Sequence, residues 1–480
     1  MTFFRPALLA LACIVAQPVF ASDLPSLGDS SSSIVSPEQE HKLGRAWLSI
    51  LRGQVRQLED PLLKEYIENS VYNLVETSQL NDRRLEFIVL ASPQLNAFAA
   101  PGGIIGVNGG LLLHAQTEAE YASVMAHELA HLSQRHFARG LEAQKRMQVP
   151  LMAAMLAGVI AAAAGGGDLG MAAIASTQAA AVQSQRSFSR QNEQEADRIG
   201  LVNLAKAGFD PRAMPSMFER LMRQYRYDRM PPEFLLTHPV SESRIADTRN
   251  RAEQYSDSTG AVAVDSLYYQ LIRARVQLTF EETSGLALKR FRSLLNDDSS
   301  LDAARYGLVL ALIRSSQLDE AQSNIDMLLK KSPNSIIYNL AAVDIELSRN
   351  KLSQAQARVE HLLKSNPRNF PLRKAQYEIQ LKQKDITGAE RTINQLLKQR
   401  PNDPDIWFEV AEIRGLANNI IGLHEARAEY FSRVGDYTQA IEQLDYAKQR
   451  ASNNFPLAAR IDARQQALIA EEIAIKKMLK

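Results

Sequence analysis

The segment His127-Glu128-Leu129-Ala130-His131 carries two histidines four residues apart, with a glutamate next to the first. On an α-helix, residues i and i+4 lie about 40° apart, so both imidazoles can reach one metal ion. Glu128 points toward the same place, where it can polarise a metal-bound water. This HExxH spacing is typical of zinc metallopeptidases and predicts a helix with two zinc ligands.

A third ligand must come from elsewhere, because a catalytic zinc site holds three protein ligands and one open position. Phe137 and Gln134 stand where a metzincin has its third histidine and its glycine, which excludes that arrangement. His136 is close in sequence, but on a continued helix it would lie about 180° from His127. We therefore expect a structural or solvent-exposed role for His136.

A second helix is predicted to supply the missing ligand. Glu193 and Asp197 stand at i and i+4 within residues 189–200 and share one helix face. Glu193 can bind zinc, while Asp197 can hydrogen-bond a ligand histidine and fix its tautomer. Glu195 points about 200° away from Glu193 and is expected to be solvated. Alone, such a charged segment is more often an exposed face, so the assignment depends on the HExxH upstream.

Composition and the N-terminus indicate an exported protein. The 55 basic and 54 acidic residues give a formal net charge of +1, which argues against a general nucleic-acid or anionic-membrane surface. A short basic start, an apolar run over 7–15 and the end Val19-Phe20-Ala21 predict a signal peptide over residues 1–21. The run is too short for a membrane anchor, and lipidation at Cys13 is the minor alternative. The bacterial periplasm fits best.

Cys13 is the only cysteine of the 480 residues and lies inside the predicted signal peptide. A mature chain would therefore use neither thiolate ligands nor a cysteine nucleophile. Any metal site must then be built from histidines and carboxylates.

We expect a metallopeptidase domain over 22–255, a polar linker over 256–265 and a helical domain over 266–480. In the first domain the apolar pattern predicts helices over 37–79 and a strand over 85–90. A second strand over 104–107 should end in a tight turn at Asn108-Gly109-Gly110. Thr117 and Glu120 form the pattern of a capping box before the HExxH helix. The predicted fold is mainly α with a small β-sheet.

Residues 149–183 change abruptly to Ala, Met, Leu and Gly, with three glycines at 165–167. Two short apolar helices joined by a flexible hinge are expected. One interpretation is a buried helical hairpin. The other is a mobile flap over the site or a loop that touches a membrane, since apolar surface beside a hinge suits both.

A 34-residue period marks the C-terminal domain. Two residue types recur at this interval, namely Pro333, Pro367 and Pro401, and Ala321, Ala355 and Ala389. This is the period of tetratricopeptide repeats, helix pairs that stack into a superhelix. Ala440 lies in a similar segment but 51 residues after Ala389, which predicts an extra helix around 415–426. Prolines interrupt each unit, which excludes a coiled coil.

Four motifs resemble the gluzincin peptidases of the HtpX and CAAX prenyl protease family. In order they are the segment 96–103, the HExxH, the segment 189–197 with Glu193 and Asp197, and Thr237-His238-Pro239 followed by Arg244. The resemblance implies one Zn²⁺ per subunit, held by His127, His131 and Glu193, with Glu128 as general base. It also implies that His238 approaches the metal from a loop, either as a fourth ligand in a latent state or to stabilise the tetrahedral intermediate.

The signal peptide and the repeats extend this resemblance to periplasmic proteases that enhance β-barrel assembly. It implies a zinc endopeptidase with a chaperone role that degrades misfolded or stalled outer-membrane proteins. The repeats would dock β-barrel clients and the barrel assembly complex, no nucleic acid is expected, and residues 149–183 would supply any peripheral membrane contact.

Ile104, Ile105 and Val107 are expected to pair an extended substrate along the edge of their strand. Two other hypotheses remain. The first is a chaperone or scaffold whose main work is done by the repeats. The second is a membrane-embedded peptidase like the HtpX relatives, which the sequence disfavours because no clear spanning helix follows residue 21.

Overall fold

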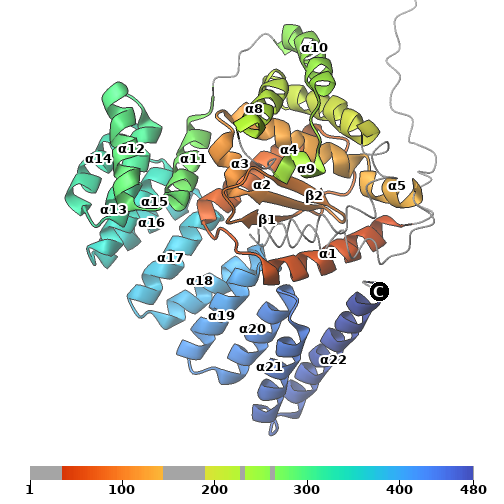
Figure 1. The fold of residues 1–480 in the computed structure, drawn as a ribbon. Coiled ribbons are helices and arrows are strands. Elements are labelled where there is room, and N and C mark those ends of the chain that lie inside the picture. Colours follow the sequence, from red (N-terminus) through yellow and green to blue (C-terminus); the bar gives the residue numbers. More distant parts are fainter. Residues whose placement is uncertain (1–34, 144–189, 228–232, 260–264, 479–480) are drawn as a thin grey trace, which may run out of the picture.

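The structure is a computed structural model that describes residues 35–143, 190–227, 233–259 and 265–478. The predicted signal peptide over 1–21 and the apolar segment over 149–183 lie outside these residues. The described residues form the predicted peptidase domain around a small sheet, and a long array of helices curves around this domain (Figure 1). No helix in these four ranges is long and apolar enough to cross a membrane.

The predicted N-terminal helical region forms two helices, α1 (Pro37–Gln54) and α2 (Pro61–Thr77). Each begins with a proline in its first turn, where a missing N–H costs nothing. The side chains of Ser36 and Asp60 cap the two helices by accepting hydrogen bonds from free backbone N–H groups. Helices α1 and α2 face the helical array and contact its helices.

Three strands form the sheet, β1 (Glu86–Leu90), β2 (Ala97–Ala100) and β3 (Ile104–Asn108), in the order β1-β3-β2. Strand β3 pairs with β1 in parallel and with β2 in antiparallel orientation. The sequence predicted β1 and β3 but missed β2, since four residues of Ala and Phe carry little strand signal.

The prediction that Ile104, Ile105 and Val107 line a substrate-binding edge is wrong. All three side chains are 0% exposed, and neighbouring strands occupy both edges of β3. A short apolar run does not reveal whether its strand is central or lateral. In the described sheet, the strand next to the HExxH helix that keeps an outer edge is β2.

The chain does not turn back at Asn108-Gly109-Gly110, as the sequence suggested. It continues into a short helix, α3 (Gly109–His114). The HExxH residues lie on α4 (Glu118–Ser133), where the Thr117 side chain accepts the Glu120 N–H as predicted. The Glu120 carboxylate accepts the N–H of Gln116 instead of that of Thr117, so the predicted capping box is only half formed.

A helix over 190–206 packs closely against α4, and Gly200 stands at the contact. A Cβ at Gly200 would lie 3.2 Å from backbone atoms of Ala126 and His127, which is tighter than ordinary packing. The glycine therefore allows the approach that brings Glu193 and Asp197 to the HExxH histidines.

The other described helices of this domain are α5 (His136–Ala143), α8 (Ala213–Tyr227), α9 (Glu233–Thr237) and α10 (Glu242–Thr259). Because α10 reaches Thr259, the first residues of the predicted 256–265 linker are helical. The next described helix begins at Leu267.

The C-terminal domain is helical throughout its described residues. Its helices are α11 (Leu267–Phe280), α12 (Ser284–Asp297), α13 (Asp302–Arg314), α14 (Leu318–Lys331), α15 (Ile336–Ser348), α16 (Leu352–Ser365), α17 (Phe370–Lys382), α18 (Ile386–Gln399), α19 (Pro404–Leu416), α20 (Ile420–Arg433), α21 (Tyr437–Arg450) and α22 (Phe455–Met478). The periodic alanines Ala321, Ala355 and Ala389 are fully buried on α14, α16 and α18. The predicted extra helix is α20.

The turns between paired helices repeat with the same 34-residue period. Each contains a non-glycine residue in the left-handed region, with φ between 57° and 61°, at Ser316, Asn350, Lys384 and Asn418. Such residues are uncommon and mark a fixed turn geometry. The repeat seen in the sequence is therefore also a repeat of backbone conformation.

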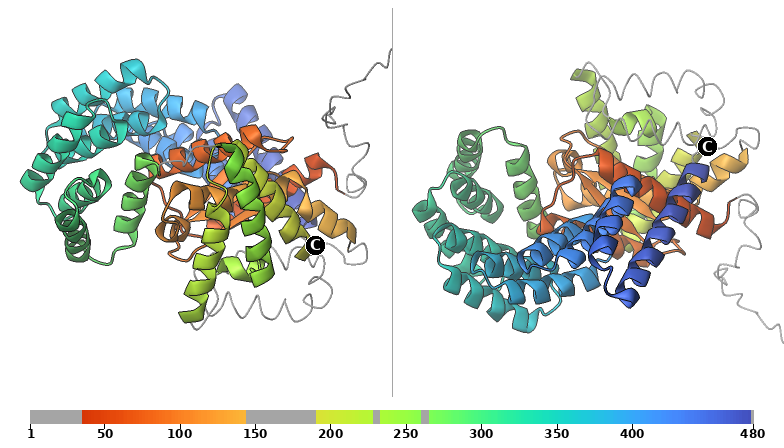
Figure 2. Two further views of the ribbon diagram at one scale, coloured as in Figure 1. Left: turned by 90° about the horizontal axis from the view of Figure 1, so that it is seen from above. Right: turned by 90° about the horizontal axis from the view of Figure 1, so that it is seen from below.

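The array curves around the peptidase domain and contacts α1 and α2 (Figure 2). Arg400 donates to the Glu68 carboxylate at 2.6 Å, and its guanidinium lies 4.0 Å from the ring centre of Phe370. Lys64 pairs with Asp405 at 2.5 Å. These contacts join α2 to the turns and helix starts of the middle repeats, so the two domains form one packed body.

We predict that Arg400→Glu destabilises this junction, because it places two carboxylates side by side at a largely buried contact. A loss of roughly 1–2 kcal/mol should lower the thermal midpoint by about 2–4 °C and increase cleavage by an added protease. Adding Glu68→Arg should restore most of the loss. Lys331→Glu, which breaks the exposed pair with Asp302 inside the repeats, is the control. Strictly additive effects of the changes at 68 and 400 would contradict the prediction.

Candidate metal centre

Four side chains from three segments converge inside the peptidase domain. They are His127 and His131 on α4, Glu193 on the 190–206 helix and His238 just after α9, and one ligand atom of each lies within 4.8 Å of the others. The Nε2 atoms of His127 and His131 are 3.1 Å apart. Oxygens of Glu193 lie 3.4 Å from His127 Nε2 and 3.5 Å from His131 Nε2. The structure thus brings the three predicted ligands together.

This donor set suits a divalent metal ion. Two imidazole nitrogens and a carboxylate oxygen face one point, which is the usual protein contribution to a catalytic metal site. Burial acts to lower the pKa of His127, but Asp197 and Glu193 outweigh it and raise this pKa to about 10. The cluster therefore attracts cations, whether a proton or a metal.

Arg244 organises the carboxylates behind the cluster. Its Nε and Nη2 donate to the two oxygens of Asp197 at 2.8 and 2.7 Å, and Asp197 Oδ1 lies 3.0 Å from His127 Nδ1. Its Nη1 donates to the Pro239 carbonyl at 2.6 Å and lies 3.1 Å from Glu193 Oε2. One buried arginine therefore ties both acidic residues of the 190–206 helix to the segment that carries His238.

Glu128 is buried beside the cluster. Its Oε2 accepts the Ala99 N–H of β2 at 2.9 Å, and its Oε1 lies 3.4 Å from His238 Nε2. Burial raises the pKa of Glu128, which suits a carboxylate that must take up a proton. Sequence reasoning did not foresee Ala99, because the contact joins two elements that are remote in sequence.

His238 occupies the fourth corner of the cluster. Its Nδ1 lies 3.1 Å from Glu193 Oε1 and 3.4 Å from His127 Nε2, and its ring stacks on Phe234 at 4.8 Å between centres. The side chain is 11% exposed. The predicted approach of His238 to the ligands is therefore present in this structure.

His136 is not solvent-exposed, and the partly exposed Glu195 contacts it. His136 is buried, with its Nδ1 2.9 Å from His131 Nδ1, and Glu195 Oε2 lies 3.2 Å from His136 Nε2. The expectation of an exposed or merely structural histidine assumed that α4 continues through it. The helix ends at Ser133, and Arg135 turns the chain in the left-handed region, which no sequence pattern indicated.

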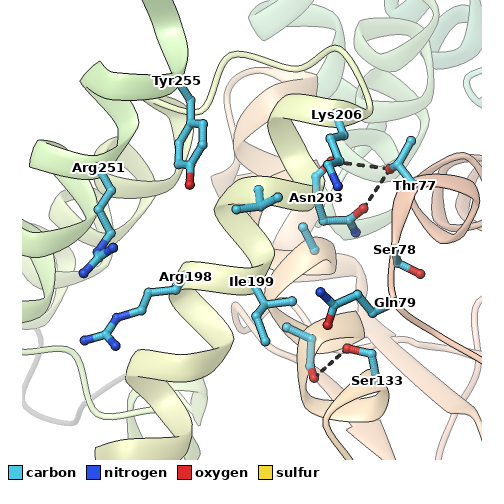
Figure 3. Close-up of a pocket in the computed structure, with 13 residues that line it drawn as sticks. Thr77, Ser78, Gln79, Ser133, Arg198, Ile199, Asn203, Lys206, Arg251 and Tyr255 are labelled. Carbon is cyan, nitrogen blue, oxygen red and sulfur yellow. Dashed lines mark hydrogen bonds between the residues drawn. The ribbon is translucent and has the colours of Figure 1, made fainter. Parts of the chain in front are cut away.

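A separate cavity lies on another face of α4 (Figure 3). Its lining includes Ala126 and Ala130 on α4, Ile199 on the 190–206 helix, and Thr77, which donates to Asn203 Oδ1 at 2.7 Å. The ligand residues do not line this cavity. It is therefore lined by other side chains of these helices and is distinct from the cluster.

Comparisons with known proteins agree with this geometry. Residues 61–252 match Peptidase family M48, and all four residues of the cluster lie in that range. The chain is 38% identical over 355 residues to the beta-barrel assembly-enhancing protease of Escherichia coli strain K12, and the matched region covers 72% of each chain. It is 34% identical over 450 residues to that of Yersinia pestis, covering 92% of this chain and 90% of the relative. Mitochondrial metalloendopeptidase OMA1 of Arabidopsis thaliana is 30% identical over 227 residues, 47% of this chain and 44% of its own.

We predict that Arg244→Ala weakens metal retention, because it leaves the buried Asp197 carboxylate without its paired charge. Removing one partner of a buried ion pair costs about 3–5 kcal/mol. Arg244→Lys keeps the charge but loses the two-point contact, so it should show an intermediate loss. Metal content after dialysis against a weak chelator measures the effect. Arg251→Ala, at a half-exposed pair with Asp247, is the control and should behave as wild type. Full retention in both Arg244 variants would refute the prediction.

Proposed function

The chain belongs to the family of beta-barrel assembly-enhancing proteases, which are metallopeptidases, and on this premise we propose that it is a periplasmic zinc endopeptidase acting on outer-membrane proteins. In this proposal it degrades misfolded or stalled clients and assists β-barrel assembly. The observation that carries the enzymatic part is the buried cluster of His127, His131 and Glu193 with Glu128 beside it.

Zn²⁺, one per subunit, is the proposed metal. Two imidazoles and one carboxylate form the ligand set of many hydrolytic zinc sites, and hard, all-oxygen sites for magnesium or calcium look different. When bound, the metal would supply a more acidic water and polarise the scissile carbonyl.

The chain's own residues perform the proton transfers in this proposal. Glu128 takes the proton of the attacking water and passes it to the leaving amine. Asp197 holds the His127 ring through Nδ1, so that Nε2 remains free as a ligand atom. The support is geometric, since Glu128 and the ligand residues face the same buried space.

Strand β2 replaces β3 as the proposed docking strand for substrate. The N–H of Ala99 points from β2 toward Glu128. An extended peptide laid along this outer edge would therefore pass the general base and the ligand cluster. Such pairing suits unfolded segments, because a folded protein seldom offers a free extended backbone.

His238 is proposed as a fourth ligand that keeps the resting enzyme latent. Its Nδ1 stands as close to Glu193 and His127 as these residues stand to each other. An imidazole in this place competes with water and substrate for the open position. The alternative role, stabilising the tetrahedral intermediate, would require His238 to move away from the ligand atoms first.

The repeats are proposed to dock β-barrel clients and the barrel assembly complex. Part of the array is used by the peptidase domain itself, through α1 and α2. Large apolar side chains remain exposed toward the C-terminal end, including Phe408, Leu416 and Phe455 at 51%, 63% and 82% exposure. Exposed apolar residues on a repeat array are suited to protein partners.

A second function as a chaperone follows from the same repeats. Client binding by the array needs no peptide hydrolysis, so it would persist in an inactive enzyme. A variant without the general base separates the two functions.

We predict that Glu128→Gln abolishes casein cleavage, because the amide cannot accept the proton. The rate should fall by roughly 10²–10⁴-fold while bound zinc stays near one per chain. Glu120→Gln on the same helix, away from the cluster, is the matched control. Client assembly that survives in Glu128→Gln would demonstrate a separate chaperone function. Cleavage at the wild-type rate would disprove the assignment of the base.

We predict that His238→Ala raises basal casein cleavage several-fold, because removing the fourth imidazole opens the position for water. His238→Asn should give a smaller rise. Zinc content should remain near that of wild type, since His127, His131 and Glu193 are intact. A fall in cleavage with normal zinc content would instead favour the role in stabilising the intermediate.

A further inference from the structure

We propose that His136 and Glu195 are positioning residues, which hold the ligand His131 through a hydrogen-bonded chain that fixes its tautomer. This inference rests on the proposed metal site. It concerns two residues that the sequence assigned no role in the site.

The ring of His131 points its two nitrogens in different directions. Nε2 faces the cluster, 3.1 Å from His127 Nε2 and 3.5 Å from Glu193 Oε1. Nδ1 faces away and lies 2.9 Å from Nδ1 of His136. A hydrogen bond at this distance needs one nitrogen with a proton and one with a lone pair.

The metal requirement decides which nitrogen donates. For His131 Nε2 to offer a lone pair to a metal, its Nδ1 must carry the proton. His136 Nδ1 must then accept, and a neutral His136 carries its own proton on Nε2. This Nε2 lies 3.2 Å from Glu195 Oε2, which can only accept when ionised. The chain from His131 through His136 to Glu195 therefore has a single consistent arrangement of protons.

Glu195 is itself held in place. Arg139 Nη1 donates to its Oε2 at 2.8 Å, so the carboxylate remains charged and oriented. The His136 side chain is 5% exposed, which protects its two contacts from competing water. The chain thus begins at a half-exposed ion pair and ends at His131, whose side chain is 15% exposed.

The two ligand histidines are supported in the same way. His127 turns Nε2 to the cluster and Nδ1 to Asp197 at 3.0 Å. His131 turns Nε2 to the cluster and Nδ1 to His136. An outer partner of this kind fixes ring orientation and raises the basicity of the ligand.

The backbone adopts an unfavourable conformation at Arg135, which brings His136 to His131. Arg135 has a φ of +50°, a region that costs a non-glycine residue on the order of 1 kcal/mol or more. Its side chain stabilises the bend by donating to Glu40 at 3.2 Å and to the Val35 carbonyl at 2.8 Å. The bend ends α4 and starts α5 (His136–Ala143), which folds His136 back onto His131.

The variants His136→Asn and His136→Gln test the proposal. The Oδ1 of asparagine takes the place of the histidine Nδ1 and can accept the His131 proton. The glutamine amide takes the place of Nε2, so it can contact Glu195 but leaves His131 without an acceptor. His136→Leu removes both contacts. The probe is Zn²⁺ competed with a chromophoric chelator, together with the visible absorption spectrum of the Co²⁺-substituted protein.

We expect His136→Gln and His136→Leu to weaken Zn²⁺ binding by about 10–100-fold and to shift the Co²⁺ bands. His136→Asn should stay within about threefold of wild type, with an unchanged Co²⁺ spectrum. Glu195→Ala should give a smaller loss, and Glu195→Gln, which keeps an acceptor, should give less still. Circular dichroism of each variant without metal checks that the fold is retained.

Two outcomes would overturn the inference. Zinc binding by His136→Gln and His136→Leu at wild-type strength would show that the chain does not support His131. Equal losses of Zn²⁺ affinity in His136→Asn and His136→Gln would show that His136 only fills space. A wild-type protein that binds neither Zn²⁺ nor Co²⁺ would instead overturn the proposed function, which is a distinguishable result.

Discussion

Mutual neutralisation of buried charge is the constraint on which the peptidase domain depends. Glu128, Glu193 and Asp197 are almost fully buried, and an isolated carboxylate in such a place would be very unfavourable. The histidines and Arg244 compensate them through short contacts, and Gly200 lets the two helices come close enough for those contacts. The geometry of the metal cluster is thus a consequence of charge pairing between α4, the 190–206 helix, His238 and the start of α10, which carries Arg244.

Local spacing explains what the sequence could predict. His127 and His131 depend on one helix, and Glu193 and Asp197 on another, so their i, i+4 spacing was enough to place them on common faces. The 34-residue period likewise predicted the repeats, because three successive units use the same turn and the same buried alanine. In each case the sequence pattern and the structural feature that it predicts lie within one helix or one helix pair.

Contacts between remote elements explain what the sequence missed. The central place of β3 depends on the order of three strands, and an apolar run is compatible with either position. His136 was misplaced because a single left-handed residue, Arg135, ends the helix, and α1 helps to stabilise that conformation. Neither fact is present in the local pattern. The domain junction on α2 was missed for the same reason, since Glu68 and Arg400 meet only in the folded chain.

The hydrogen bond from Ala99 to Glu128 has a consequence for when the enzyme can work. The Ala99 N–H and Oε2 of Glu128 satisfy each other, whereas Oε1 of Glu128 has no hydrogen-bond partner among the described residues. A peptide that docks on β2, as proposed above, would take over the Ala99 N–H and leave this oxygen of Glu128 free to accept a proton. In the proposed mechanism, occupancy of the strand edge and the ability of Glu128 to accept a proton are therefore linked.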